Sequence, residues 1–298
     1  MPDKNARIID IGCANGGLLK EIQSLGYRNL LGVDPSEMCV ERTRTQLGIS
    51  AMIGSLSNIP EQLGKFDLVI LSHVLEHVLD LNQAVYEISN LVSENGSVYV
   101  EVPDATRYAD RVIAPFQDIN TEHVNHFSLN ALRNLFSKVE FIAKSEVSRS
   151  IRITIDADYP VTHMVLQKGK PEMRIQFDEI LNNCIIRYIT ESKKILTKLD
   201  QRLQVILAGN PMVIIWGTGQ LAMKLLADTC LGGARIFCYV DSNPINQGKK
   251  IQGIPIVSPE SIRYKLEPII IASTIYQDNI VAQIREMGLP NELILLKG

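Results

Sequence analysis

The stretch RIIDIGCANGG, residues 7–17, decides the fold. Its first half is a short apolar run, which is typical of a buried strand in a parallel sheet. The glycines that follow allow a tight turn, and the helix predicted for LLKEIQSLG (18–26) would offer free N–H groups to a ligand. This order of strand, glycine turn and helix predicts the first βα unit of a Rossmann-like sheet.

Strands and helices alternate along the rest of the first half. Further strands are predicted for four apolar runs, at 29–34, 66–72, 97–104 and 161–169. SEMCVERTRTQLG (36–48) predicts a helix with Ser36 as its N-cap, and FDLVILSHVLEHV (66–78) is expected to run from a strand into a helix. The alternation predicts βαβ units and a mostly parallel sheet.

The pattern changes near residue 170. Apolar residues recur at near-helical spacing over 171–209, which predicts one long or two shorter amphipathic helices. Strand, glycine turn and helix return in MVIIWGTGQLAMKLLAD (212–228). We therefore expect a first domain at 1–169, a helical linker at 170–209 and a second, smaller Rossmann-like α/β domain at 210–298.

The composition is that of a soluble globular protein. The chain has 298 residues, 46% of them hydrophobic, and a net charge of −3 without basic runs, which argues against a nucleic-acid footprint. No apolar run is long enough for a membrane span, and the N-terminus shows no signal-peptide core. The five cysteines form no C-x-x-C pair. We expect a cytoplasmic protein with no nucleic-acid or membrane partner.

The first glycine turn predicts a nucleoside site. Asp34 closes the second strand, 22 residues after Gly12, where a carboxylate can accept hydrogen bonds from both hydroxyls of an adenosine ribose. The dinucleotide pattern G-x-G-x-x-G is not met, because Gly12, Gly16 and Gly17 have a different spacing.

IIDIGCANGG, the acid at Asp34 and FDLVILSHVLEHV, in this order, resemble the class I S-adenosylmethionine-dependent methyltransferases over about the first 170 residues. The resemblance implies a mostly parallel sheet with an antiparallel last strand, and S-adenosylmethionine as cofactor. The cofactor-binding residues that it implies are Asp10, Gly12, Cys13, Gly16, Asp34, Pro35, Ile53 and Ser72.

Three departures from this family bear on the cofactor site. The second family glycine is replaced by Ala14 or Asn15, and the acid that often lies near Ser55 is absent. The first strand begins by residue 7, without the helices that usually precede it and cover the cofactor, so we expect either a shortened chain or a cofactor site that is more open than usual in the family.

FQDINTEHVNHFS (116–128) gathers two of the five histidines beside a carboxylate. The loop resembles one in sugar methyltransferases that commonly reads Tyr-His-Glu-His, then two residues, then Tyr-Phe-Ser. The resemblance implies that His123 is the catalytic base and that Glu122 orients it or contacts the sugar. Asn120 and His126 would contact the substrate. The alternative is that Glu122 and His123 only cap the helix after Ser128, itself a sound N-cap.

His73, Glu76 and His77 would share one face of the helix predicted after the fourth strand. His73 lies at the carboxyl end of that strand and is expected to line the substrate cleft. Glu76 and His77 are expected to be a solvated or capping pair. No cysteine or adjacent acidic pair completes a ligand set, so no metal site is predicted.

The second glycine turn, WGTGQLA (216–222), fits G-x-G-x-x-A, and Asp241 follows the next strand. An NAD site is one interpretation, but the remaining chain suffices for a half-sheet and not for a full dinucleotide domain. This domain resembles the C-terminal domain of sugar C-methyltransferases, which helps to enclose a nucleotide-linked sugar.

The leading hypothesis is an enzyme that transfers a methyl group from S-adenosylmethionine to a sugar, nucleotide-linked, in glycan or glycoside biosynthesis. The missing tyrosine and the absence of a cysteine-rich N-terminal segment favour oxygen over carbon as the acceptor. The alternatives are an NAD(P)-dependent sugar oxidoreductase and a catalytically inactive binding module. The expected partner is a small-molecule sugar, and the sequence leaves open whether the protein forms a homodimer.

Overall fold

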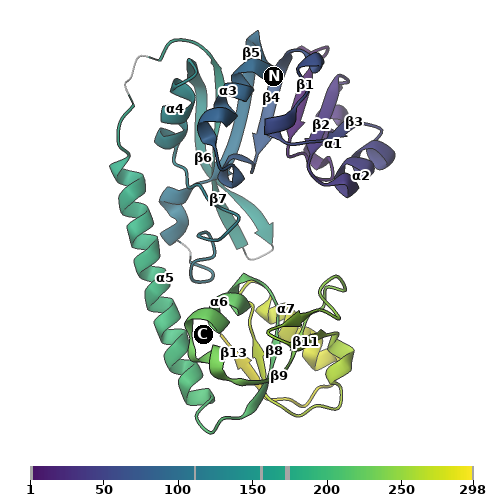
Figure 1. Ribbon diagram of the computed structural model, residues 1–298, viewed down its shortest axis with the longest axis vertical. Coiled ribbons are helices and arrows are strands. Elements are labelled where there is room, and N and C mark those ends of the chain that lie inside the picture. Colours follow the sequence, from purple (N-terminus) through teal and green to yellow (C-terminus); the bar gives the residue numbers. More distant parts are fainter. Residues whose placement is uncertain (1–2, 111, 155–156, 172–174, 297–298) are drawn as a thin grey trace. The chain divides into compact units, whose positions relative to one another are not determined.

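A computed structural model describes residues 3–110, 112–154, 157–171 and 175–296 (Figure 1). The chain divides into two compact units, each with its own core. The first unit contains residues 1–108 and 119–185, and the second contains residues 109–118 and 186–298. The segment at 109–118 therefore belongs to the second unit, although it lies within the predicted first domain.

The first unit is built on a seven-stranded sheet in the order β3-β2-β1-β4-β5-β7-β6. Its strands are β1 (Ile8–Ile11), β2 (Leu30–Asp34), β3 (Ser50–Ile53), β4 (Phe66–Ser72), β5 (Val92–Pro103), β6 (Phe141–Thr154) and β7 (Ala157–Lys168). Strands β1 to β5 pair in parallel, whereas β7 runs antiparallel to both of its neighbours. The prediction of a mostly parallel, Rossmann-like sheet is confirmed.

Helices cover both faces of this sheet (Figure 1). They are α1 (Gly17–Ser24), α2 (Glu37–Leu47), α3 (Leu81–Leu91) and α4 (Leu129–Ser137). Leu19 and Ile22 of α1 pack with Ile8 and Ile70 on one face, while α3 and α4 pack against the opposite face. Because β1, β2 and β4 pair in parallel, their carboxyl ends lie at one edge of this covered sheet.

The chain does not continue from β4 into a regular helix, so that prediction is wrong. His73 adopts a left-handed conformation with φ of 56°, and only Leu75–His77 form a short 3₁₀ turn. A left-handed residue with a side chain is uncommon, and such residues concentrate at functional sites. His73, Glu76 and His77 therefore do not share the face of one helix.

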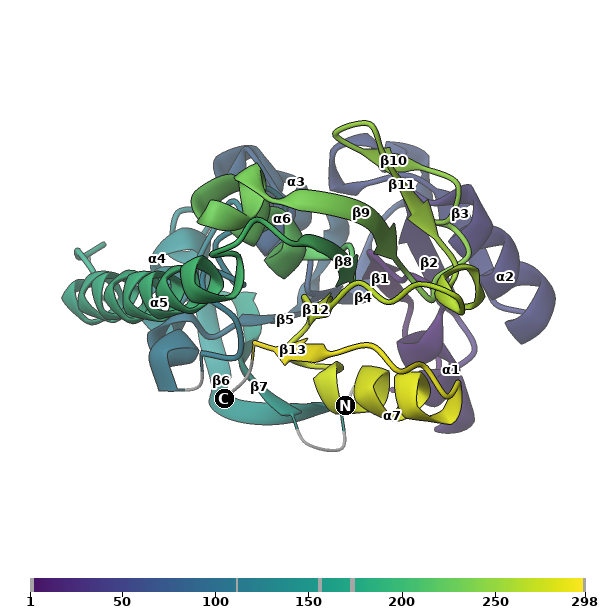
Figure 2. The same ribbon diagram turned by 90° about the horizontal axis from the view of Figure 1, so that it is seen from below.

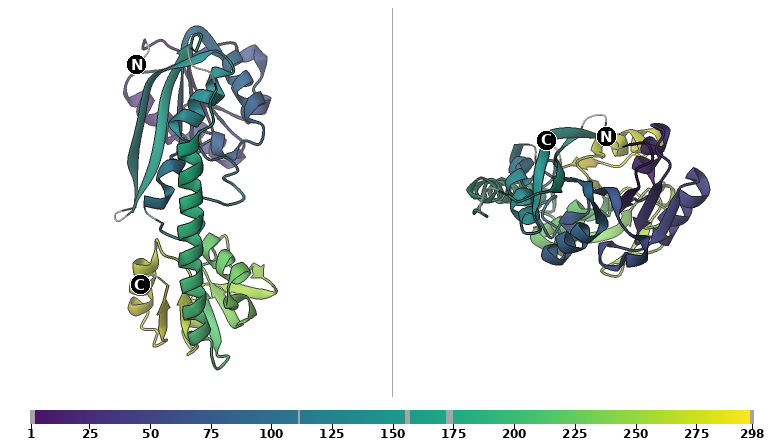
Figure 3. Two further views of the ribbon diagram at one scale, coloured as in Figure 1. Left: turned by 90° about the vertical axis from the view of Figure 1, so that its left-hand side faces the viewer. Right: turned by 90° about the horizontal axis from the view of Figure 1, so that it is seen from above.

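The segment predicted as a linker forms a single helix, α5 (Glu179–Ile206), seen unbroken in Figure 3. Its first residues belong to the first unit and the rest to the second, where Leu199 and Leu203 are core residues. The segment at 109–118 packs on this second part. Phe116 donates its backbone N–H to Ser192 Oγ at 3.1 Å, and Asp118 donates its own to Tyr188 Oη at 3.0 Å.

The second unit has a six-stranded sheet in the order β10-β11-β9-β8-β12-β13. Its strands are β8 (Met212–Trp216), β9 (Arg235–Val240), β10 (Lys250–Ile251), β11 (Ile254–Val257), β12 (Ile269–Ile271) and β13 (Leu293–Leu295). Helices α6 (Gln220–Asp228) and α7 (Gln277–Glu286) lie on opposite faces (Figure 2). The expectation of a half-sheet is thus wrong, although several strands are very short. Within the described residues, no helix has the length and apolarity to cross a membrane.

Candidate active site

The glycine turn after β1 is shaped by close packing. A side chain at Gly12 would place its Cβ 2.6 Å from Val74 Cγ2, and one at Gly16 would come within 2.9 Å of Thr43 and Leu47. Both glycines also have positive φ, 78° and 74°. The turn therefore lies directly against the segment that follows β4, which brings two predicted parts of the site together.

Ala14 is one of the two residues expected to replace the missing family glycine. Its φ is 47°, in the region where a Cβ is unfavourable, and its backbone N–H donates to Asp34 Oδ2 at 2.8 Å. The hydrogen bond holds the turn in this conformation despite the alanine. Of the two candidate replacements, Ala14 and not Asn15 has the left-handed geometry.

Asp34 lies at the carboxyl end of β2 and is 8% exposed. One oxygen accepts the Ala14 N–H and the other accepts the Ser36 N–H at 2.9 Å. A carboxylate has about four lone-pair positions, so each oxygen can still accept one further hydrogen bond. The geometry suits a ligand with two neighbouring hydroxyls.

Asp10 is the second buried carboxyl group of this edge, at 3% exposure. Burial, and to a lesser degree the charge of Asp34, raises the pKa of Asp10 to about 7. Among the described residues, no basic side chain forms an ion pair with Asp10 or Asp34. Two buried acids without a cation suit a positively charged ligand such as a sulfonium, so the residues present fit S-adenosylmethionine.

The other predicted cofactor residues differ in how they are placed. Ile53 is 52% exposed and pairs in register with Asp34, so it offers apolar surface beside that carboxylate. Pro35, which follows Asp34 in the sequence, is exposed. Cys13, by contrast, buries its side chain in the core beside Gly32, where burial raises the thiol pKa to about 12. Only the backbone of Cys13 is available to a ligand.

A polar cluster that the sequence did not indicate lies at the ends of β4 and β5. Glu101 accepts hydrogen bonds from Arg149 at 2.9 Å, Tyr99 at 3.0 Å and Ser72 at 3.4 Å. Burial alone would raise the pKa of Glu101, but the hydrogen bonds from Arg149 and Tyr99 outweigh burial and lower it. Strands β5, β7 and β6 are neighbours in the sheet, which is what brings Arg149 to Glu101.

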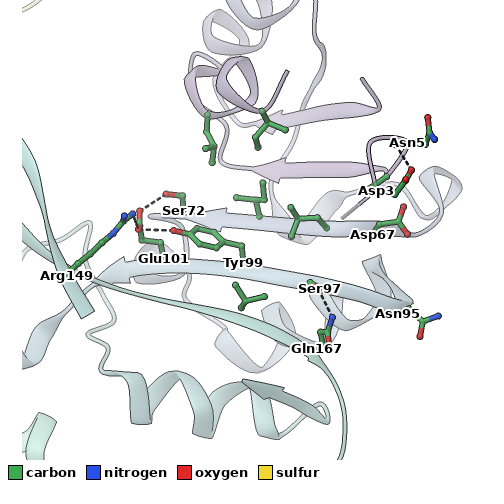
Figure 4. A pocket seen from close by; sticks show the side chains of 16 residues that line it. Asp3, Asn5, Asp67, Ser72, Asn95, Ser97, Tyr99, Glu101, Arg149 and Gln167 are labelled. Atoms are coloured by element: carbon green, nitrogen blue, oxygen red, sulfur yellow. Dashed lines mark hydrogen bonds and ion pairs between the residues drawn. The ribbon is translucent and has the colours of Figure 1, made fainter. Parts of the chain in front are cut away.

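Figure 4 shows this cluster at one end of a cavity of about 950 Å³ on the face of the sheet. Leu18 and Ile70 are among the apolar side chains that line it. Of the predicted cofactor-binding residues, only Ser72 lines it, so the cavity adjoins the predicted cofactor site and does not coincide with it.

His73 connects the cavity with the segment after β4. Its Nδ1 donates to Glu76 Oε1 at 3.0 Å, and its Nε2 lies 3.9 Å from Glu101 Oε1. The hydrogen bond to Glu76 raises the pKa of His73 against the opposing effect of burial. It lies just after the carboxyl end of β4, no helix carries it, and its role in lining the substrate cleft stays a prediction.

The loop at 119–127 folds over the 3₁₀ turn. Val124 and Asn125 donate their backbone N–H groups to the Glu76 carbonyl at 2.9 and 3.1 Å. The Asn125 side chain donates to the carbonyls of Leu75 and Val78 at 3.1 and 2.6 Å. These bonds fix the loop that carries His123 beside the end of β4.

The predicted catalytic and substrate residues of this loop have distinct surroundings. The His123 ring is half-buried, 5.0 Å from the His77 ring. Asn120 Oδ1 accepts the backbone N–H groups of Glu122 and His123, and the His126 ring lies edge-on to Tyr108 at 5.9 Å. Within the described part of the chain, the exposed Glu122 carboxylate forms no hydrogen bond, so it does not orient the His123 ring.

The burial of Glu76 differs from the solvated position that the sequence predicts. It is 1% exposed, so it is not half of a solvated pair, whereas His77 is exposed as expected. Glu76, His77 and His123 each bring one potential ligand atom within 4.8 Å of the others. The expectation that the protein holds no metal stays a prediction.

In the second unit, Asp241 follows β9 as predicted. Its carboxylate accepts hydrogen bonds from Thr218 Oγ1, from Asn246 Nδ2 at 2.9 Å and from the Asn243 N–H at 2.8 Å. These local donors occupy most of its lone pairs, which disfavours a ribose contact in an NAD site.

Comparison with known families gives one match in each half of the chain. Residues 1–143 match the family model described as "Methyltransferase domain". Residues 209–295 match a second one, described as "C2185-like, N-terminal".

Known proteins resemble one or both parts. The ubiquinone biosynthesis O-methyltransferase of Bartonella quintana is 28% identical over 111 residues, which are 36% of this chain and 44% of that protein. The C-methyltransferase NovU of Streptomyces niveus is 23% identical over 271 residues, 85% of this chain and 62% of NovU. The chain thus spans less than two thirds of either relative.

A solved S-adenosylmethionine-dependent methyltransferase from Mesorhizobium loti is 18% identical, with a TM-score of 0.46, and covers 56% of this chain and 94% of its own. The family match, the sheet order and the acids at the ends of β1 and β2 concern the same part of the chain. Residues 1–143 therefore match a methyltransferase domain, of the kind that uses S-adenosylmethionine, and this match lies mostly within the first unit.

Proposed function

We propose that this protein transfers a methyl group from S-adenosylmethionine to an oxygen or carbon atom of a nucleotide-linked sugar. The observation that carries the proposal is the meeting of two sets of groups at one sheet edge. Asp10 and Asp34 lie at the ends of β1 and β2, and His73 and His123 lie beside the end of β4. A donor and an acceptor molecule would thus meet at the same edge.

Asp34 would hold the ribose hydroxyls of the cofactor, and Ile53 would contact its adenine. When bound, the cofactor supplies a methyl group made electrophilic by the positively charged sulfur. Asp10, buried next to Asp34, would stabilise that positive charge. The backbone of the glycine turn, which Gly12 and Gly16 keep narrow, would border the methionine part.

His123 would accept the proton that the acceptor atom loses. A positioned base contributes about 100- to 10,000-fold to a rate. The loop around His123 is held by four hydrogen bonds to the segment at 75–78, which keeps the ring in place. The exposed Glu122 would contact the sugar, and His73, Asn120 and His126 would line the acceptor site.

The sugar substrate rests on the resemblance of the loop and of the C-terminal domain. The alignment with the C-methyltransferase NovU extends over 271 residues and so includes both units, which supports methyl transfer by a protein with both parts and says nothing of the sugar. The alignment with the ubiquinone O-methyltransferase covers 111 residues and supports the methyltransferase part alone.

The test is methyl transfer from isotopically labelled S-adenosylmethionine to a panel of nucleotide sugars, with NMR of the product to distinguish a methyl on oxygen from one on carbon. His123→Asn should lower turnover by at least about 100-fold while the melting temperature and the cofactor affinity hold. Glu140→Gln, which removes an exposed carboxylate outside the loop, is the control. Turnover of His123→Asn within a few-fold of wild type would refute the catalytic role.

If no nucleotide sugar is methylated but a phenolic acceptor is, the substrate class is wrong and the methyltransferase assignment stands. If labelled cofactor binds and no acceptor of either class reacts, the inactive binding module is the better description.

A further inference from the structure

Glu76 has an unusual environment for a carboxylate. Its side chain is 1% exposed, and Oε1 accepts the hydrogen bond from His73 Nδ1. Its second oxygen, Oε2, is buried and has no hydrogen-bond partner among the described residues. Buried charged oxygens are nearly always paired, so one without a partner calls for a ligand that supplies positive charge or a donor.

The orientation of His77 leaves the lone pair of one ring nitrogen available to a metal ion. Its Nδ1 lies 2.9 Å from the carbonyl oxygen of Glu122. A carbonyl can only accept, so Nδ1 carries the proton and Nε2 keeps its lone pair. A hydrogen bond from the second ring nitrogen to a backbone carbonyl is the usual support of a metal-bound histidine.

His123 completes the set. One nitrogen of each imidazole and one Glu76 oxygen all lie within 4.8 Å of one another. In a tetrahedral zinc site, with bonds of about 2.0–2.1 Å, ligand atoms lie roughly 3.3 Å apart. Movements of the side chains by about 1 Å would therefore bring all three ligand atoms to bonding distance of one ion.

We infer that Glu76, His77 and His123 form a binding site for one divalent first-row metal ion, with Zn²⁺ as the best match. Two imidazoles and one carboxylate are a known zinc ligand set that leaves a position open. Mg²⁺ prefers oxygen ligands and suits this set poorly.

This site goes beyond the proposed function. A ring nitrogen that binds an ion cannot also take up a proton, so Zn²⁺ at this site would compete with proton transfer to His123. Because the ion needs neither cofactor nor acceptor, its binding can be measured whether or not the protein transfers methyl groups.

The experiment is calorimetric titration of the chelator-treated full chain with Zn²⁺ and, separately, with Mg²⁺, followed by elemental analysis after dialysis. We expect one Zn²⁺ per chain and much weaker binding of Mg²⁺. His77→Ala, an exposed position, should weaken Zn²⁺ binding at least about tenfold. Glu76→Gln should do the same, and if it fails to fold, His123→Asn takes its place.

Glu122→Gln is the matched control, since it removes an exposed carboxylate beside the three ligands without changing them. It should bind Zn²⁺ like the wild type. The inference is overturned if the wild type binds no stoichiometric Zn²⁺, if His77→Ala binds it unchanged, or if Glu122→Gln weakens binding as much as His77→Ala does.

Discussion

The buried Asp10 should make the first unit less stable as the pH rises. Its pKa is 3.8 in an unfolded chain and about 7 in the folded protein. Between these values the folded state holds a proton that the unfolded state has released, so the free energy of unfolding falls as the pH rises. A gap of about 3 between the two pKa values corresponds to about 4 kcal/mol, complete once the pH exceeds 7.

Replacing Asp10 by Asn removes the titration and nearly keeps the shape. The stability of Asp10→Asn relative to wild type should therefore increase by about 2.5 kcal/mol between about pH 5 and about pH 8. Glu21→Gln, which removes an exposed carboxylate of α1, is the control and should show no such increase.

The assay must report on the first unit alone. The single tryptophan, Trp216, lies in β8 of the second unit, so its fluorescence follows that unit and provides an internal reference. Hydrogen exchange of the β1 and β4 amides, measured by mass spectrometry, follows the first. An unchanged difference between Asp10→Asn and wild type at the two pH values would refute the reasoning.

Three further predictions concern the same edge. Binding of the cationic cofactor near pH 7 should release protons by lowering the Asp10 pKa, seen as a buffer-dependent heat in calorimetry; equal heats in wild type and Asp10→Asn would contradict this. Ala14→Gly should raise the stability of the first unit by up to about 1 kcal/mol, because glycine tolerates a φ of 47°, and chemical denaturation showing a loss would contradict it. Asp34→Ala should weaken S-adenosylmethionine binding about 10- to 150-fold by calorimetry, and an unchanged affinity in a folded variant would remove Asp34 from the site.

Most of the sheet could be predicted because buried parallel strands leave continuous apolar runs in the sequence. The helix predicted after β4 was wrong for a reason that lies in another part of the chain. Carbonyl groups that a helix would use internally, at Leu75, Glu76 and Val78, accept hydrogen bonds from Val124 and Asn125 instead. Because these donors lie in a distant part of the chain, the sequence around residues 75–78 does not reveal that they replace the hydrogen bonds of a helix.

The same difference between local and distant interactions separates the site residues that could be predicted from those that could not. Gly12 and Asp34 could be predicted because Gly12 directly follows β1, Asp34 closes β2, and both strands end at the ligand-binding edge. The cluster of Tyr99, Glu101 and Arg149 could not, since it depends on β7 lying between β5 and β6. The buried state of Glu76 likewise depends on the loop at 119–127 and not on its neighbours in sequence.

The segment at 109–118 has a consequence for anyone who wishes to separate the two halves of this protein. Ala114 is part of the hydrophobic core of the second unit, and Lys224 lies 4.5 Å from the ring centre of Phe116. A truncation after Ile185 would remove the part of α5 against which residues 109–118 pack. The apolar side chains of this segment would then be exposed to water. A recombinant second half starting at Ile186 would lack them in turn, so neither fragment is an autonomous module and the chain is best handled whole.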